Sequence, residues 1–265
     1  MSKIIYKVLD RAIRLILLAL ILYSIAFSLV CSYGAWKLYS YGKAILDEVE
    51  SLKYTQPAQS AFMKNLQSAS PKLEIKQRFV PLDSISPYLR KAAIAGEDVG
   101  FYFHPGFDVR AIALAMDANQ KRNKTVFGGS TITQQLAKNM FLSSDRSWER
   151  KFKELAYALL MEKYLGKDRI LELYLNYAQW GVNIFGCEEA AQAYYKKSCA
   201  KLTVDQSINM VAILASPGRY HPEARESRFM RDRRNMISRN MFPPKDSLFA
   251  DSLKEQAEPK SFEEP

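Results

Sequence analysis

The spacing of apolar and charged residues divides the chain into an uncharged N-terminal run, a polar connection and a long region with helical periodicity. No charged residue stands between Arg14 and Lys37, and at about 1.5 Å per residue this run of ~22 residues crosses a hydrocarbon layer of about 30 Å. The run is long for a cleaved signal peptide and ends in two aromatic residues typical of a membrane interface, Tyr33 and Trp36. We therefore predict one transmembrane helix over residues 15–36.

The flanks of this run indicate its orientation and the remaining boundaries. Basic residues predominate in residues 1–14, which predicts a cytoplasmic N-terminus and places everything after Lys37 across the membrane. Residues 37–76 are mixed to polar with scattered prolines, and we expect a linker or juxtamembrane arm. Residues 77–242 are expected to form one mainly α-helical domain, and the charged segment 243–265 a disordered tail.

Local signals inside the domain mark the ends of several helices. Asp108 is placed to cap the helix that follows it, and Thr203 with Gln206 forms a capping box ahead of an apolar run. Alternating strand patterns and hairpin turns are scarce, so the spacing favours a mainly α domain. The other predicted helices cover 148–164, closed by Gly166, and 170–177.

The net charge of +10 is typical of proteins that meet nucleic acid, an anionic membrane surface or a phosphorylated ligand. Residues 1–14 hold four basic side chains and one acidic side chain, so +3 belongs to this end and +7 to the rest. A position beyond a membrane span argues against nucleic acid. The arginine-rich segment 225–239 has amphipathic helical spacing, and we expect a solvated face that lies outside the active site.

The inventory of histidine and cysteine excludes several common kinds of site. The chain has two histidines and neither an HExxH nor a CxxC motif, which argues against structural zinc. The glycine pair at 128–129 fits neither a phosphate loop nor a nucleophile elbow. Cys187 and Cys199 are the cysteines outside the apolar run; an unbroken helix between them would hold them on the order of 18 Å apart, beyond the roughly 7 Å limit for a disulfide. We therefore expect free thiols.

One acidic segment is a candidate for proton transfer. Glu97 and Asp98 stand together just before the aromatic run Phe101-Tyr102-Phe103 and His104. Burial among aromatic rings and a neighbouring negative charge both raise a carboxyl pKa toward the range of a general base. The simpler interpretation is a helix end with two solvated carboxylates and a histidine that serves packing.

Two further segments are candidates for binding an anion. Paired glycines lead into Ser130 or Thr131 as a helix N-cap, where free amides can receive a negative group, although an ordinary glycine turn has the same pattern. The next predicted helix places three cations and Glu154 on one face. That face is either solvated or a diphosphate site, because two linked phosphates need several fixed cations. The three cations are Arg146, Arg150 and Lys153.

Together these segments resemble the peptidoglycan glycosyltransferases, a lysozyme-like family that includes the monofunctional biosynthetic transglycosylases. The resemblance runs from about Phe79 to Pro222 and keeps five motifs in order, of which the twelve-residue string GGSTITQQLAKN is the most specific. Tyr195-Lys196 departs from the family pattern, in which phenylalanine and glycine are common. No Ser-x-x-Lys follows Pro222, so we expect a monofunctional member without a transpeptidase module. The motif segments are 97–106, 128–139, 150–162, 170–176 and 186–197.

The resemblance implies a role for each candidate residue. Glu97 would be the general base that takes the proton of the acceptor sugar's 4-hydroxyl. Glu154 would be the second catalytic carboxylate, which holds the cations or a divalent ion. The implied substrate- and diphosphate-binding residues are Ser130, Gln135, Lys138, Asn139, Arg146, Arg150 and Lys153.

The resemblance also implies the reaction and its setting. The expected activity is the inverting polymerisation of lipid II into β-1,4-linked glycan, with release of polyprenyl diphosphate. No cofactor is expected to be required, although Mg²⁺ or Mn²⁺ can assist, and no dedicated metal cage is visible. The expected partners are lipid II, the lipid-linked glycan chain, the membrane, and penicillin-binding or division proteins. The expected location is the inner membrane, with a periplasmic catalytic domain.

Two other functions remain open from the sequence. A membrane-anchored lytic hydrolase on the same architecture would need a glutamic acid and no diphosphate clamp. A non-catalytic cell-wall scaffold would need neither Glu97 nor Glu154 for activity. The cationic face and the long GGSTITQQLAKN string disfavour the hydrolase, and the presence of both Glu97 and Glu154 beside the cations disfavours the scaffold.

Overall fold

The N-terminal apolar run forms part of one long helix. In the computed structural model, which describes residues 2–122, 128–142, 147–224 and 227–243, α1 is Ser2–Ser51. Within it, Ile5–Ser51 is the one helix in the described ranges that is long and apolar enough to cross a membrane. The helix continues beyond the predicted span because residues 37–51 contain good helix formers and no proline. Residues 1–48 form one unit, and residues 49–265 form a second unit.

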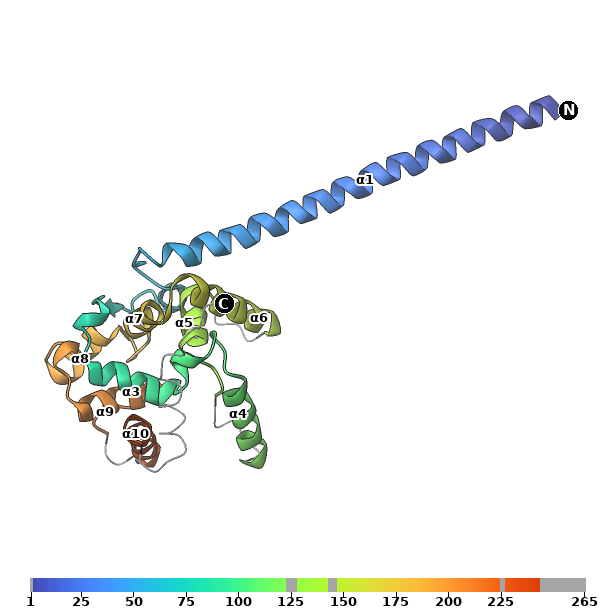
Figure 1. Cartoon of the computed structure of the whole chain (residues 1–265). Helices are drawn as coiled ribbons and strands as arrows, with labels where there is room; N and C mark the ends of the chain where they lie inside the picture. Colours follow the sequence, from blue (N-terminus) through green and yellow to red (C-terminus); the bar gives the residue numbers. More distant parts are fainter. Residues whose placement is uncertain (1, 123–127, 143–146, 225–226, 244–265) are drawn as a thin grey trace, which may run out of the picture. The chain divides into compact units, whose positions relative to one another are not determined.

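The second unit is mainly helical, as the sequence predicts (Figure 1). The two helix caps predicted from the sequence are present. Asp108 accepts hydrogen bonds from the amides of Arg110 and Ala111, and Thr203 with Gln206 closes a capping box. Its helices are α2 (Ala61–Ala69), α3 (Pro87–Glu97), α4 (Val109–Arg122), α5 (Ile132–Phe141), α6 (Trp148–Tyr164), α7 (Lys167–Tyr177), α8 (Cys187–Tyr195), α9 (Val204–Ile213) and α10 (Arg228–Met241), with short 3₁₀ turns η1 (Leu82–Ser84), η2 (Phe101–Phe103) and η3 (Cys199–Lys201).

The segment expected as a linker is partly packed into the second unit. Val49, Leu52 and Met63 are buried, and the Tyr177 hydroxyl donates a 2.5 Å hydrogen bond to the carbonyl of Pro57. The segment ends in β1 (Lys76–Gln77), which pairs in parallel with β2 (Ile184–Phe185). These contacts fix residues 49–77 against the helices. The tail predicted over 243–265 lies outside the described residues apart from Pro243.

Two helix groups carry the core and position the site. α3 packs against α9 and α10, while α5 packs against α6 and α7. Phe101, Leu136 and Trp180 are completely buried, and each such side chain contributes roughly 1.5–3 kcal/mol of hydrophobic stabilisation. The C-terminal end of α3 and the N-terminal end of α5 meet beside this core, where Asp98 accepts a hydrogen bond from the amide of Ile132.

The expected separation of Cys187 and Cys199 is wrong. α8 ends at Tyr195, and Lys196 adopts a left-handed conformation with φ of 56° that reverses the chain. The two sulfur atoms consequently lie 3.6 Å apart, although both cysteines are free thiols in the structure. The helical pattern indicated α8 correctly but gave no sign that the helix stops before Cys199.

Candidate active site

Glu97 lines a cleft of about 720 Å³. The walls come from the loop after α3, the first turns of α4, the glycine pair before α5, and two side chains of α10, Met236 and Asn240. Ser130 lines the same cleft. Two segments predicted separately from the sequence, around Glu97 and around Ser130, therefore share one cavity.

The Glu97 carboxylate is largely buried and held by two donors. It ends α3, and its side chain is 11% exposed. Gln135 of α5 donates from Nε2 to Oε2 at 3.1 Å, and Tyr174 in turn donates to Gln135 Oε1 at 3.2 Å. Arg233 of α10 donates to Oε1 at 2.6 Å. Because both oxygens accept hydrogen bonds, the geometry suits the ionised carboxylate.

Burial raises the pKa of Glu97, and the neighbouring Asp98 adds a smaller upward contribution. Arg233 and the hydrogen bond from Gln135 lower this pKa, so they offset part of the effect of burial. The position at the C-terminal end of a helix also disfavours an anion. The result is a carboxylate that is more basic than a solvated glutamate and still has its charge compensated.

The contact with Arg233 corrects the expectation for the arginine-rich segment. That segment was expected to lie outside the active site, yet α10 packs on α3 and brings Arg233 to Glu97. The Arg233 side chain is 19% exposed. Arg233 follows the buried Met230 by three residues and precedes the buried Ile237 by four, so it shares their face of α10. The amphipathic spacing predicted the helix correctly, but a sequence pattern cannot tell which of several arginines meets a distant carboxylate.

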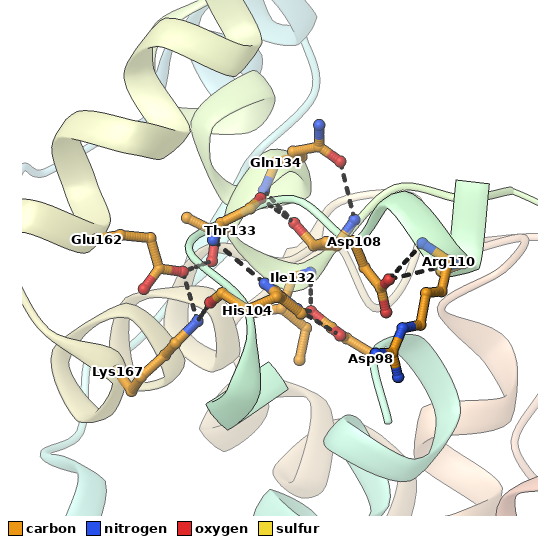
Figure 2. Close-up of polar contacts among 12 residues, drawn as sticks. Asp98, His104, Asp108, Arg110, Ile132, Thr133, Gln134, Glu162 and Lys167 are labelled. Atoms are coloured by element: carbon orange, nitrogen blue, oxygen red, sulfur yellow. Dashed lines mark hydrogen bonds and ion pairs between the residues drawn. The ribbon is translucent and has the colours of Figure 1, made fainter. Parts of the chain in front are cut away.

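Asp98 connects the loop after α3 to the start of α5. His104 Nε2 donates to Asp98 at 2.9 Å while His104 Nδ1 accepts from the amide of Gly106 at 3.2 Å, an arrangement that requires the neutral Nε2–H tautomer. The other Asp98 oxygen accepts from the amide of Ile132 at 3.0 Å. Figure 2 shows the contacts of Asp98 with His104 and Ile132. His104 thus makes hydrogen bonds that hold the loop, in line with the simpler interpretation of a structural histidine.

Glu162 of α6 and Lys167 of α7 hold the loop after α3 in place. Glu162 Oε1 accepts from the Thr133 hydroxyl at 2.6 Å and from Lys167 at 2.7 Å, and Lys167 also donates to the carbonyl of His104 (Figure 2). Gly106 sits against this group at φ of 96°, where a β-carbon would come within 2.9 Å of Glu162. The loop that follows Glu97 is therefore held on both sides.

Before α5, Gly129 allows a close approach to α4. Thr131 is the N-cap and closes a capping box with Gln134, and its hydroxyl donates to the carbonyl of Gly106 at 2.7 Å. A β-carbon at Gly129 would lie 2.8 Å from Cα of Ile112 in α4. Glycine is required there because α4 and the loop before α5 touch through their backbones.

A second cluster forms around Glu154 of α6. Arg150 donates to Glu154 at 2.9 Å, Lys151 contacts the other carboxylate oxygen, and Lys151 also reaches the Ser130 hydroxyl at 3.4 Å. Glu154 is buried. The pKa of Lys138 is lowered by loss of hydration and by the charges of Arg150 and Lys151, while Glu154 acts in the opposite direction. These cations therefore surround a single negative charge.

The two clusters are connected through α5 and Ser130. Gln135 and Lys138 are three residues apart on one helix, hence on one face. Gln135 contacts Glu97, whereas the charges of the second cluster shift the pKa of Lys138. Ser130 lines the cleft and contacts Lys151. A base and a group of cations thus flank the N-terminal turns of one helix.

The remaining sequence-predicted residues lie as follows. Lys153 Nζ contacts Glu149 Oε1 at 2.6 Å, one turn back along α6. The lysine seen on Glu154 is Lys151, which sequence reasoning missed because the predicted face was drawn through Lys153. Asn139 is half-buried on α5. Arg146 lies outside the described residues.

The carboxylates of the site do not fit a divalent cation well. Both Glu154 oxygens already contact cationic side chains, and both Asp98 oxygens contact nitrogen donors. Among the residues that the structure describes, no three His, Cys, Asp or Glu side chains gather in a way that could hold a metal ion.

Comparisons with known proteins agree with this arrangement. The family model described as "Transglycosylase" matches residues 63–242. The chain is 39% identical over 245 residues to the biosynthetic peptidoglycan transglycosylase of Bordetella pertussis, covering 89% of this chain and 93% of that protein. Proteins of the same name from Janthinobacterium sp. (strain Marseille) and Thiobacillus denitrificans are 42% and 43% identical over 189 residues, covering 70% of this chain and 81% of each relative. The chain therefore belongs to the transglycosylase family, whose domain is lysozyme-like, and is a glycosyltransferase enzyme.

Proposed function

We propose that this enzyme polymerises lipid II into β-1,4-linked glycan strands of peptidoglycan, with Glu97 as the general base. The name of its relatives supports the product class. The observation that carries the proposal is the state of Glu97. Its carboxylate lines a cleft, and the hydrogen bonds that both oxygens accept from Gln135 and Arg233 favour the ionised form, the form that can accept a proton.

The proposed chemistry follows from this arrangement. Glu97 takes the proton of the acceptor's 4-hydroxyl while that oxygen forms a bond to the anomeric carbon of the donor sugar. The bond from that carbon to the diphosphate breaks, and the electron pair leaves with the diphosphate. Attack from the side opposite the leaving group converts an α-linked donor into a β-linked product, so the reaction inverts.

The leaving diphosphate is an anion and needs positive charge more than a proton. Lys138, Arg150 and Lys151 surround Glu154 at the other end of the arrangement, and we assign to them the diphosphate, together with Arg146 and Lys153 from the family resemblance. Ser130, Gln135 and Asn139 would orient the sugar or phosphate by hydrogen bonds. Glu154 would hold these cations, or a divalent ion, at the diphosphate.

The long apolar helix supports the proposed setting. α1 suggests a membrane anchor, and an enzyme held at the surface where lipid II and the growing chain diffuse meets them at a raised effective concentration. We place the N-terminus in the cytoplasm and the catalytic unit outside the inner membrane, from the basic residues before the span. We expect penicillin-binding and division proteins as partners, and this expectation rests on the resemblance alone.

The product distinguishes the candidate functions. The purified full chain is incubated with lipid-linked disaccharide pentapeptide, and separately with preformed glycan. We expect polymer from the lipid precursor, and a Glu97→Gln variant that makes little of it. The matched control is Glu74→Gln, because Glu74 is an exposed glutamate of the same domain. Soluble fragments from preformed glycan would favour a lytic hydrolase, and undiminished polymer from the Glu97→Gln variant would contradict the role of Glu97.

A further inference from the structure

Cys187 and Cys199 meet inside the second unit at a place that the proposed reaction does not use. Cys187 is the first residue of α8, and Cys199 is the first residue of η3. Both are completely buried, and their sulfur atoms lie 3.6 Å apart. A disulfide bond of about 2.05 Å requires these sulfurs to approach by roughly 1.5 Å.

Hydrogen bonds hold the backbone turn that brings the two cysteines together. Glu188 accepts hydrogen bonds at one oxygen from the Cys199 amide at 2.8 Å and from the Ser198 hydroxyl at 3.0 Å. The amide of Ser86 donates to the carbonyl of Cys199 at 3.3 Å. The left-handed Lys196 reverses the chain between the two cysteines. The turn from α8 to η3 therefore brings the sulfurs together without any bond between them.

The location outside the cytoplasm gives the pair an oxidant. We propose that Cys187 and Cys199 form an intramolecular disulfide once this domain has crossed the membrane. The inference rests on the orientation given under the proposed function, because disulfides persist in oxidising compartments and are rare in the cytosol. It adds a covalent modification to the fold and is independent of how the glycosyl transfer proceeds.

The bond forms by thiol–disulfide exchange with a disulfide-bearing thiol oxidase. One cysteine thiolate attacks the oxidase disulfide and gives a mixed disulfide, and the second thiolate displaces the oxidase as its dithiol. Two thiol protons leave, and two electrons pass to the oxidase. Burial raises the pKa of Cys187 well above its ordinary value in the folded unit, and the thiolate is the reactive form. Exchange therefore precedes the burial of the pair, during folding.

The pairing is tested first in cells. The full chain carries Cys31→Ser to remove the cysteine in the apolar run, cells are quenched in acid, and the denatured protein is treated with a maleimide polymer that adds mass to each free thiol. We expect no added mass until a reductant is used, and then two additions. Two additions without reductant in the exported protein would overturn the proposal.

Refolding separates the geometry from the location. The reduced, unfolded full chain is refolded in detergent with a glutathione redox buffer, and a linked pair of peptides containing residues 187 and 199 is sought by mass spectrometry. We expect this pair within a single chain, and a midpoint of thermal unfolding that falls by roughly 5–10 °C on reduction. Free thiols, or links between chains, would contradict the pairing. The variant Cys187→Ala/Cys199→Ala should unfold at one midpoint that the reductant does not change.

Polymer synthesis is measured on the same refolded samples, so that the two proposals fail separately. Active protein with two free thiols would remove the disulfide and leave the proposed function. Disulfide-bonded protein that makes no polymer would remove the proposed function and leave the pairing.

Discussion

At the scale of residues, the balance of forces on Glu97 decides what the site can do. Burial against the cleft wall favours the neutral acid, whereas Arg233 and Gln135 favour the anion. A carboxylate that is both basic and ionised can accept a proton, which a transferase needs. A hydrolase needs the opposite state, a carboxylic acid that donates to the leaving sugar. Under the proposed function, the ion pair with Arg233 would therefore favour transfer over hydrolysis.

Replacing Arg233 by glutamine tests this balance. Since Arg233 lowers the pKa of Glu97, its removal lets that pKa rise, and more of the carboxyl is protonated at neutral pH. We expect the acid side of the pH–rate profile of polymerisation to move to higher pH, with the rate recovering toward that of the parent at alkaline pH.

The control is Arg231→Gln, an exposed arginine two residues earlier on α10. It should leave the profile in place. A uniform loss of rate at every pH in the Arg233 variant would indicate a purely structural role and would count against this interpretation.

Asp98→Asn tests the network of Figure 2. Both Asp98 oxygens face N–H donors, from His104 and Ile132, so one of these donors must meet the amide –NH₂ group of asparagine. A buried donor left without an acceptor costs about 1–3 kcal/mol, and we expect the free energy of unfolding in urea to fall by that amount. Asp83→Asn, at an exposed aspartate, should change it little. Equal stabilities of the two variants would show that the network is not stabilising.

At the scale of elements, helix ends were predictable where the signal is local. The Thr131 and Thr203 caps and the bounds of α6 follow from side chains that bond to their own helix. Contacts between distant elements were not predictable from the sequence. Lys151 rather than Lys153 meets Glu154, and Arg233 meets Glu97 from 136 residues away. Tertiary packing chooses among similar cations on a face, and spacing along the chain does not record that choice.

The C-cap of α8 offers a gain in stability. Lys196 is the one non-glycine residue with positive φ in the part of the chain that the structure describes, and a side chain there costs roughly 1–2 kcal/mol relative to glycine. Glycine also gains entropy in the unfolded chain, so we expect Lys196→Gly to raise the free energy of unfolding by about 0.5–1 kcal/mol.

The matched substitution is Lys201→Gly, at an exposed residue of η3 without positive φ. It should lower the free energy of unfolding in the same urea titration. If both glycine variants lose stability, the left-handed cap is not strained.

At the scale of the whole molecule, the chain divides into residues 1–48 and the unit 49–265 that contains the cleft. The sequence indicated this division through its apolar run, but it ended the span at residue 36 and began the catalytic domain at residue 77, with an arm over 37–76 between them. It missed the packing of Val49 and Leu52 because Val49 still belongs to α1, which continues without a break to Ser51 directly before Leu52. Any separation of the two parts must therefore keep residues from 49 onward.

A chain that begins at Val49 tests what the anchor contributes. With lipid II in excess in detergent, we expect its rate of polymerisation to match that of the full chain. With dilute enzyme and lipid II in vesicles, its rate should fall by about tenfold or more, because confinement to the surface is lost. A full chain with an unrelated apolar span in place of residues 15–36 should keep the vesicle rate. A truncated chain that is equally fast on vesicles would contradict the role of the anchor.

The most direct test of the central claim is the pH dependence of kcat/KM for polymerisation, compared between the parent chain and Glu97→Gln. Glu97 accepts a proton only when ionised, so the parent rate should fall as the pH drops through the raised pKa of this carboxyl. The variant should be slower by roughly 10²–10⁴-fold at neutral pH and should lack this acid limb. A variant that keeps both the rate and the acid limb of the parent would show that another group accepts the proton.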